Sequence, residues 1–135
     1  MLFPFLMACN ISPEPINYGE DACDFCDMTI VSKAHAAQGV TDKGKQFKYD
    51  AIECLVNDVL KNNREFAIKQ VADFSVPGSM ISAENAQFII NDTINSPMGA
   101  NLAALKQSGE EKIDNYSWDE LKKHFLGDEK VSVNH

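Results

Sequence analysis

A strand–turn–strand pattern followed by a helical pattern constrains the fold of this chain more than any other feature of its sequence. Residues 28–41 are rich in β-branched and small side chains, and strand-like residues resume from Gln46 to Tyr49. Between them, Asp42-Lys43-Gly44-Lys45 supplies residues that favour a turn. The segment therefore predicts a β-hairpin that leads directly into a helix.

The helix is predicted from Asp50 to the pair Asn62-Asn63, which ends it. Asp50 is placed to act as the N-cap, with Glu53 three positions later, as in a capping box. The apolar residues recur at the i, i+4, i+7 and i+8 spacing of one helical face: Ile52, Val56, Val59 and Leu60. Helix capping accounts for both acidic residues without a role in chemistry.

The remaining elements are shorter. Residues 65–75 alternate as in a strand and end at the turn Pro77-Gly78, and residues 87–91 form a further strand candidate. Residues 100–106 fit a strand or a helix, because periodicity does not decide so short a run. Ser117 and Glu120 form a capping box for a last helix through Phe125. This order predicts an α+β protein with largely antiparallel sheets.

Composition limits the functional classes. With 135 residues and 44% hydrophobic residues, the chain suits one compact domain, or two very small ones with a shared core. A net charge of -8 would repel phosphates, so nucleic acid is not expected as a partner. The sequence has no recognisable arrangement of nucleophile, base and oxyanion donors, so we do not expect an enzyme.

The N-terminal residues 1–9 are apolar up to Cys9, where the composition becomes polar. Leu6-Met7-Ala8-Cys9 resembles the lipobox of a bacterial lipoprotein, in which Cys9 would be acylated. No positive n-region precedes it, so this start can lie inside a longer signal. We expect residues 1–9 to be a signal remnant, residues 10–22 a tether, and the protein a membrane-anchored lipoprotein of the periplasm or cell envelope. The alternative is a hydrophobic N-terminus with an incidental cysteine.

Cys23-Asp24-Phe25-Cys26-Asp27-Met28 places two thiols and a thioether within six residues. Soft sulfur ligands select Cu(I) over hard cations. In an extended strand, Cys26 and Met28 would lie on the same face, about 7 Å apart. Nearby aspartates disfavour a free thiolate but favour a bound cation. The segment therefore predicts a Cu(I) site, with Cys26 and Met28 as its main ligands.

Other interpretations of these residues stay open. Cys23 and Cys26 could rest as a disulfide, serve as a thiol-disulfide oxidoreductase pair, or bind structural zinc, although no second Cys or His pair follows them. Met98, in the loop Ser96-Pro97-Met98-Gly99, and His35 are further candidate ligands. Cys54 lies in an apolar helical stretch, where a thiol behaves as a small hydrophobe.

Three features together resemble the NosL family. They are the motif Cys23-x-x-Cys26-x-Met28 before the segment 33–38, the step from Phe47 to Asp50 before a helix with Cys54, and the loop 96–99. NosL proteins are lipoprotein accessory factors of nitrous oxide reductase. The resemblance implies a Cu(I) chaperone that delivers copper for assembly of the reductase's copper-sulfide centre.

The resemblance also implies two related ββαβ units, akin to the organomercurial lyase fold. We expect a domain over residues 23–127, with units of about 23–75 and 76–127, and a polar tail over 128–135. The family's ligands fall on Cys26, Met28 and Met98, while Cys23 and His35 would assist. The chain departs from the family in having Asp27 where a glycine often stands, and in a short stretch between Lys106 and Ser117 where longer members have a helix.

Overall fold

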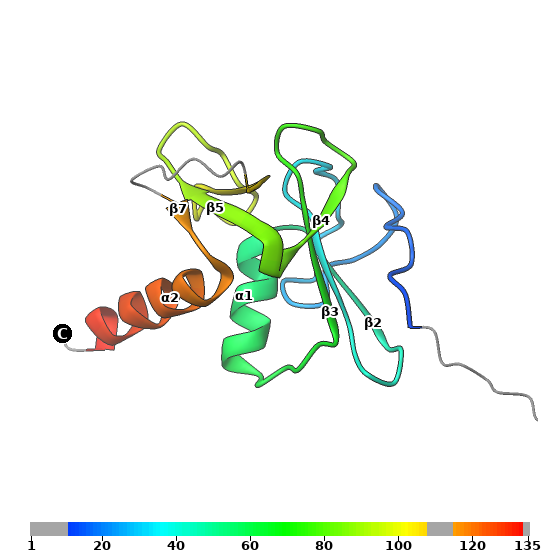
Figure 1. Ribbon diagram of the computed structural model, residues 1–135, viewed down its shortest axis with the longest axis horizontal. Coiled ribbons are helices and arrows are strands. Elements are labelled where there is room, and N and C mark those ends of the chain that lie inside the picture. Colours follow the sequence, from blue (N-terminus) through cyan, green and yellow to red (C-terminus); the bar gives the residue numbers. More distant parts are fainter. Residues whose placement is uncertain (1–10, 108–114, 134–135) are drawn as a thin grey trace, which may run out of the picture.

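The computed structural model describes residues 11–107 and 115–133. Cys9 and the lipobox lie outside this part of the chain. The structure is an α+β protein with two small antiparallel sheets and two α-helices among the described residues (Figure 1), which confirms the predicted fold class. The elements are β1 (Ala37–Val40), β2 (Gln46–Tyr49), α1 (Ile52–Lys61), β3 (Ile68–Ala72), β4 (Met80–Ser82), the 3-10 helix η1 (Ala83–Asn85), β5 (Ala86–Ile90), β6 (Leu102–Lys106), β7 (Asn115–Tyr116) and α2 (Trp118–Val133).

The first sheet has the strand order β2-β1-β3-β4. Its hairpin pairs Ala37 with Tyr49, and the turn is closed by the hydrogen bond from Thr41 N–H to the Lys45 carbonyl (3.0 Å). The predicted hairpin is therefore confirmed, but its first strand begins at Ala37 and not at Met28. Residues 28–36 are not part of a named strand. Met28 and Thr29 instead pair with residues 22–23 and close a turn.

Helix α1 begins at Ile52 with Ala51 as its N-cap residue, and no side chain caps it. The prediction that Asp50 caps this helix is wrong, because the Asp50 carboxylate accepts a hydrogen bond from Val31 N–H instead (3.2 Å). The end of the helix is as predicted, with Asn62 as the C-cap residue. In Figure 1, α1 lies in the middle of the molecule, between the first sheet and α2.

The second sheet has the strand order β6-β5-β7. Residues 102–106, for which the sequence left strand and helix open, form β6 and pair with β5 along its whole length. Phe74 N–H donates to the Ala104 carbonyl (2.8 Å), which joins the two sheets. The first unit follows the order β1, β2, α1, β3, and the second sheet is followed by α2. β4 pairs with β3, so the first sheet extends to Ser82.

Helix α2 begins with the predicted capping box. Glu120 N–H donates to Ser117 Oγ (3.2 Å), and Ser117 N–H donates to Glu120 Oε1 (3.1 Å). The prediction that the helix ends at Phe125, before a loose tail, is wrong, because its backbone stays helical to Val133. Gly127 lies within this helix. A glycine inside a helix costs about 1 kcal/mol of stability relative to alanine, which is too little to end the helix here.

The capping box gives a first prediction. We expect Ser117→Ala to lower the free energy of unfolding by about 1 kcal/mol, because the N–H of Glu120 loses its acceptor. Urea denaturation followed by circular dichroism measures this change. Ser117→Asp keeps an acceptor at the N-cap and should stay within about 0.5 kcal/mol of the wild type. Equal loss in both variants would contradict the capping role.

Candidate metal centre

Residues 23–28 form a tight turn. Cys23 N–H donates to the Met28 carbonyl (2.8 Å), and Asp27 N–H donates to the Cys23 carbonyl (3.0 Å). Asp27 has a φ of 64°, in the left-handed region where glycine is favoured and aspartate is tolerated. Cys26 and Met28 therefore do not lie on an extended strand, and the prediction that they share a strand face is wrong. The turn instead brings Cys26 N–H to 3.5 Å from Cys23 Sγ.

The turn is fixed to the hairpin by Asp21, Asp24 and Lys48. Asp24 N–H donates to the Lys48 carbonyl (2.8 Å), and Lys48 N–H donates to the Asp24 carboxylate (2.7 Å). The Lys48 ammonium also lies 2.9 Å from Asp21 Oδ2. Two of the aspartates flanking the cysteines thus hold the turn against β2.

Three thiols converge behind this turn. The Sγ atoms of Cys23, Cys26 and Cys54 all lie within 4.8 Å of one another, and all three cysteines are free. Cys23 and Cys54 are each 1% exposed, whereas Cys26 is half-buried. Cys54 belongs to the first turn of α1, so the helix that follows the hairpin supplies the third thiol. The sequence interpretation of Cys54 as a buried small hydrophobe gives its burial but misses this contact.

The hydrogen bonds of the cluster distribute its charge unevenly. The Cys54 thiol hydrogen-bonds to Cys23 and, helped by nearby backbone N–H groups, lowers the pKa of Cys23 to about 5. The same hydrogen bond raises the pKa of Cys54. Burial raises the pKa of Cys26. The expectation that the aspartates disfavour a thiolate therefore does not hold for Cys23, because direct hydrogen bonds to its sulfur decide the direction.

The other predicted ligands lie in different surroundings. Met28 is 60% exposed and Met98 is 49% exposed, so both thioethers reach solvent. His35 is buried, and its Nδ1 lies 3.2 Å from the Leu102 carbonyl oxygen, which places the ring proton on Nδ1. Its ring also packs against Phe74, with centroids 5.5 Å apart. Among the described residues, the three thiols form a group that does not include His35.

Glu53 connects α1 to the loop of Met98. Ser96 Oγ donates to Glu53 Oε2 (2.6 Å), and Ala100 N–H donates to the same oxygen (3.0 Å). The predicted capping role of Glu53 is therefore wrong: this 2% exposed side chain holds both ends of a loop from the second sheet. Because Cys54 follows Glu53 directly, one helical turn supplies both a cluster thiol and the support of the loop.

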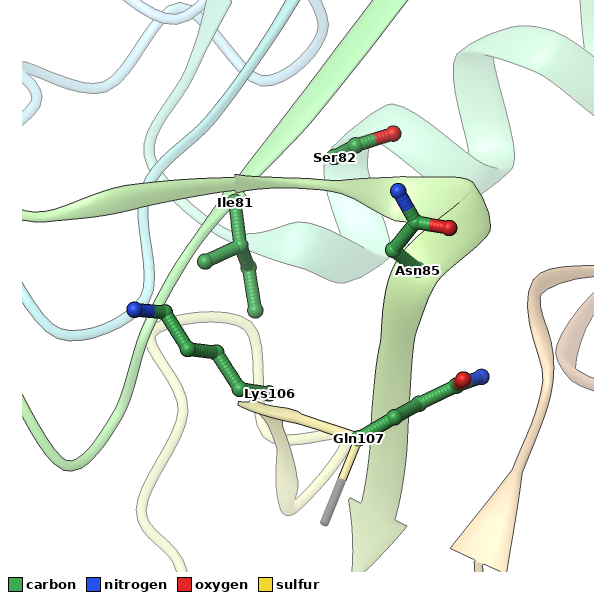
Figure 2. Close-up of a pocket in the computed structure, with 5 residues that line it drawn as sticks. All are labelled: Ile81, Ser82, Asn85, Lys106 and Gln107. Carbon is green, nitrogen blue, oxygen red and sulfur yellow. The ribbon is translucent and has the colours of Figure 1, made fainter. Parts of the chain in front are cut away.

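A separate hollow of about 410 Å³ opens between β4 and the end of β6 (Figure 2). Its lining residues are Ile81, Ser82, Asn85, Lys106 and Gln107. They offer no thiol, imidazole or carboxylate, and the hollow is wide open to solvent. The hollow therefore offers no soft or anionic ligand for a metal ion.

Comparison with known proteins places this chain in a family. The NosL family profile matches residues 16–112. The chain belongs to the NosL family. The crystal structure of the copper chaperone NosL from Shewanella denitrificans superposes with a TM-score of 0.62 at 15% sequence identity, over 73% of this chain and 81% of that one. No curated protein matches the chain.

This NosL chain presents a donor set suited to a thiophilic ion. No fourth Cys, His, Asp or Glu of the described residues joins the three thiols, whereas structural zinc almost always takes four ligands. Disulfide exchange needs an accessible thiol of low pKa, but here the thiol with the low pKa, Cys23, is buried. The cluster therefore fits a soft metal better than a four-ligand zinc centre or a redox pair.

In residues 11–107 and 115–133, no helix is long and apolar enough to cross a membrane.

Proposed function

We propose that this chain binds Cu(I) and delivers it to apo nitrous oxide reductase for assembly of the copper-sulfide centre. One observation carries the proposal: a half-buried thiol, Cys26, lies at the mouth of a buried thiol cluster, two residues before the exposed thioether of Met28. Thiolate and thioether together select Cu(I). The copper chaperone from Shewanella denitrificans, which has the same fold, supports the same cargo.

In this proposal, Cys26 and Met28 hold the cargo at the surface, assisted by Cys23, Met98 or His35. If His35 takes part, Nε2 is the nitrogen that binds, because Nδ1 faces the Leu102 carbonyl. A site with few ligands leaves a position open for a ligand of the acceptor. Transfer then proceeds through an intermediate in which both proteins bind the ion, and its oxidation state does not change.

The proposal also includes the setting of this transfer. Acylation of Cys9 would anchor the chain to a membrane of the cell envelope, with the folded part facing the periplasm. The net charge of -8 favours docking to a basic surface of the reductase, with an association rate that falls as salt is raised. The protein that supplies copper to this chain is not identified by these features.

Replacement of Met28 tests the surface site. We expect Met28→Leu to slow the transfer of Cu(I) about 10-fold, because leucine keeps the size of the side chain but removes the sulfur that holds the ion at the surface. The measurement is the rate at which loaded, reduced protein passes copper to a chromophoric Cu(I) chelator without oxygen. The variant should also deliver less copper to apo nitrous oxide reductase when loaded at the same free-copper level.

Met80→Leu is the matched control, because Met80 belongs to β4 and packs against the hydrophobic core. Its transfer rate should equal that of the wild type. If Met28→Leu and Met80→Leu pass Cu(I) on equally fast, Met28 does not hold the ion at the surface. If the loaded wild type fails to pass copper to the apo reductase, the delivery proposal is wrong.

A further inference from the structure

Cys54 is a thiol that the proposed surface site does not use. It comes from α1, whereas Cys23 and Cys26 come from the turn before the hairpin. Its Sγ nevertheless lies within 4.8 Å of both of theirs. A separate helix therefore places a soft donor atom next to two others, at the inner end of the site.

Packing alone explains this arrangement poorly. A buried cysteine that acts as a small hydrophobe can contact any apolar carbon. Cys54 lies in the main hydrophobic core and yet has two sulfurs beside its own. A disulfide also leaves the arrangement unexplained, because a disulfide joins two cysteines and one of the three would remain over.

The spacing fits a three-coordinate metal. A trigonal ion with metal–sulfur bonds of about 2.3 Å, as in zinc thiolates, holds its sulfurs about 4 Å apart. The three Sγ atoms already lie within 4.8 Å of one another, so contraction by less than about 1 Å would close the site. Side-chain adjustments of this size are enough, because the sulfurs are already neighbours and Cys23 and Cys54 both belong to the core.

We propose that Cys54, together with Cys23 and Cys26, forms an inner all-thiolate position for Cu(I), which rests on the proposed copper-binding function. Cys26 belongs to both positions, since it is the partly exposed member of the three and precedes Met28. The inner position retains the cargo away from solvent, and the outer position presents it to the acceptor.

The exchange between the two positions balances without an oxidant or reductant. On loading, Cu(I) displaces the protons that the three thiols still carry, and these protons pass to solvent. On moving outward, the bonds from copper to the sulfurs of Cys23 and Cys54 break, and a bond to the neutral thioether of Met28 forms. Protons then return to the inner thiols, while copper stays Cu(I) throughout.

The first test removes the exposed thioethers and leaves the core intact. In the Met28→Leu/Met98→Leu double variant, loaded with one equivalent of Cu(I), copper X-ray absorption should show three sulfur neighbours. A count of three that falls to two when Cys54→Ala is added to the same variant assigns the third sulfur to Cys54. Two or fewer sulfur neighbours in the double variant itself would overturn the inner position. Both replaced side chains are exposed, so the folded chain should be retained.

The second test is Cys54→Ala, which keeps a small apolar residue in the core. We expect its Cu(I) affinity to fall at least about 30-fold, a factor equal to about 2 kcal/mol, in protein whose circular dichroism matches that of the wild type. Unchanged affinity and an unchanged sulfur count in this folded variant would refute the role of Cys54 but leave the proposed function standing. Failure of the wild type itself to bind Cu(I) would instead refute the proposed function.

Discussion

Cys26→Ala should weaken Cu(I) binding by at least about 100-fold, equal to about 2.7 kcal/mol, which is the largest functional effect that we expect from a single substitution. Cys26 is the half-buried thiol of the cluster and the one that both copper positions share. Its loss removes a thiolate from each position at once, whereas the loss of Met28 affects the outer position only. Competition with a Cu(I) chelator on reduced protein measures the difference.

Asp27→Gly is the matched control for this prediction. It changes the same turn but leaves every sulfur in place, and glycine accepts the left-handed φ of 64° without strain. We expect its copper affinity to stay within about threefold of the wild type, or about 0.7 kcal/mol. Equal losses in Cys26→Ala and Asp27→Gly would mean that the turn geometry matters and that the Cys26 thiol does not.

Glu53→Ala should have the largest effect on stability, lowering the free energy of unfolding by about 2 to 3 kcal/mol. The Ser96 hydroxyl and the Ala100 N–H both donate to Glu53 Oε2, and both would lose their acceptor in a buried place. Urea denaturation of the copper-free protein gives this value. The same variant should release the Met98 loop, which faster hydrogen exchange of the Ala100 amide would report.

Glu53→Gln separates hydrogen bonding from packing. Its amide oxygen can still accept from Ser96 and Ala100, so we expect a loss of less than about 1.5 kcal/mol. If glutamine and alanine destabilise the chain equally, these two hydrogen bonds do not hold the loop, and the loss of the carboxylate accounts for the effect, because glutamine keeps the volume of the side chain.

Elements specified by their own residues were predicted well from the sequence. The turn around Gly44, the end of α1 at Asn62 and the capping box of Ser117 all depend on neighbours in the chain, and the structure confirms each. The length of α2 was underestimated, because the helix was expected to end at Phe125 and its backbone stays helical to Val133. Local signals thus gave the elements more reliably than their lengths.

The capping box assigned to Asp50 and Glu53 shows where such reasoning fails. The spacing of the two acidic residues fits the motif, but each side chain has a partner distant in sequence: Val31 N–H for Asp50, and Ser96 with Ala100 for Glu53. Tertiary hydrogen bonds displaced the local ones. A single sequence does not reveal these pairings, because they depend on how two loops pack against α1.

The candidate site was predicted in part for the same reason. Cys23 and Cys26 lie together because they share one turn, and the Cys-x-x-Cys spacing indicated this. Cys54 joins them only through the packing of α1 against the hairpin. The available signal was a thiol in the first turn of the helix that follows the hairpin, and burial in an apolar stretch concealed it.

Because Glu53 and Cys54 are consecutive, the first turn of α1 connects the Met98 loop to the thiol cluster. Glu53 holds a loop of the second sheet, and Cys54 lies beside the sulfurs of the turn that precedes the hairpin. A rotation of the helix about its own axis that loosens one contact must disturb the other. A change in the position of the Met98 loop is therefore expected to shift the Cys54 sulfur, and copper binding at the thiol cluster is expected to shift the loop.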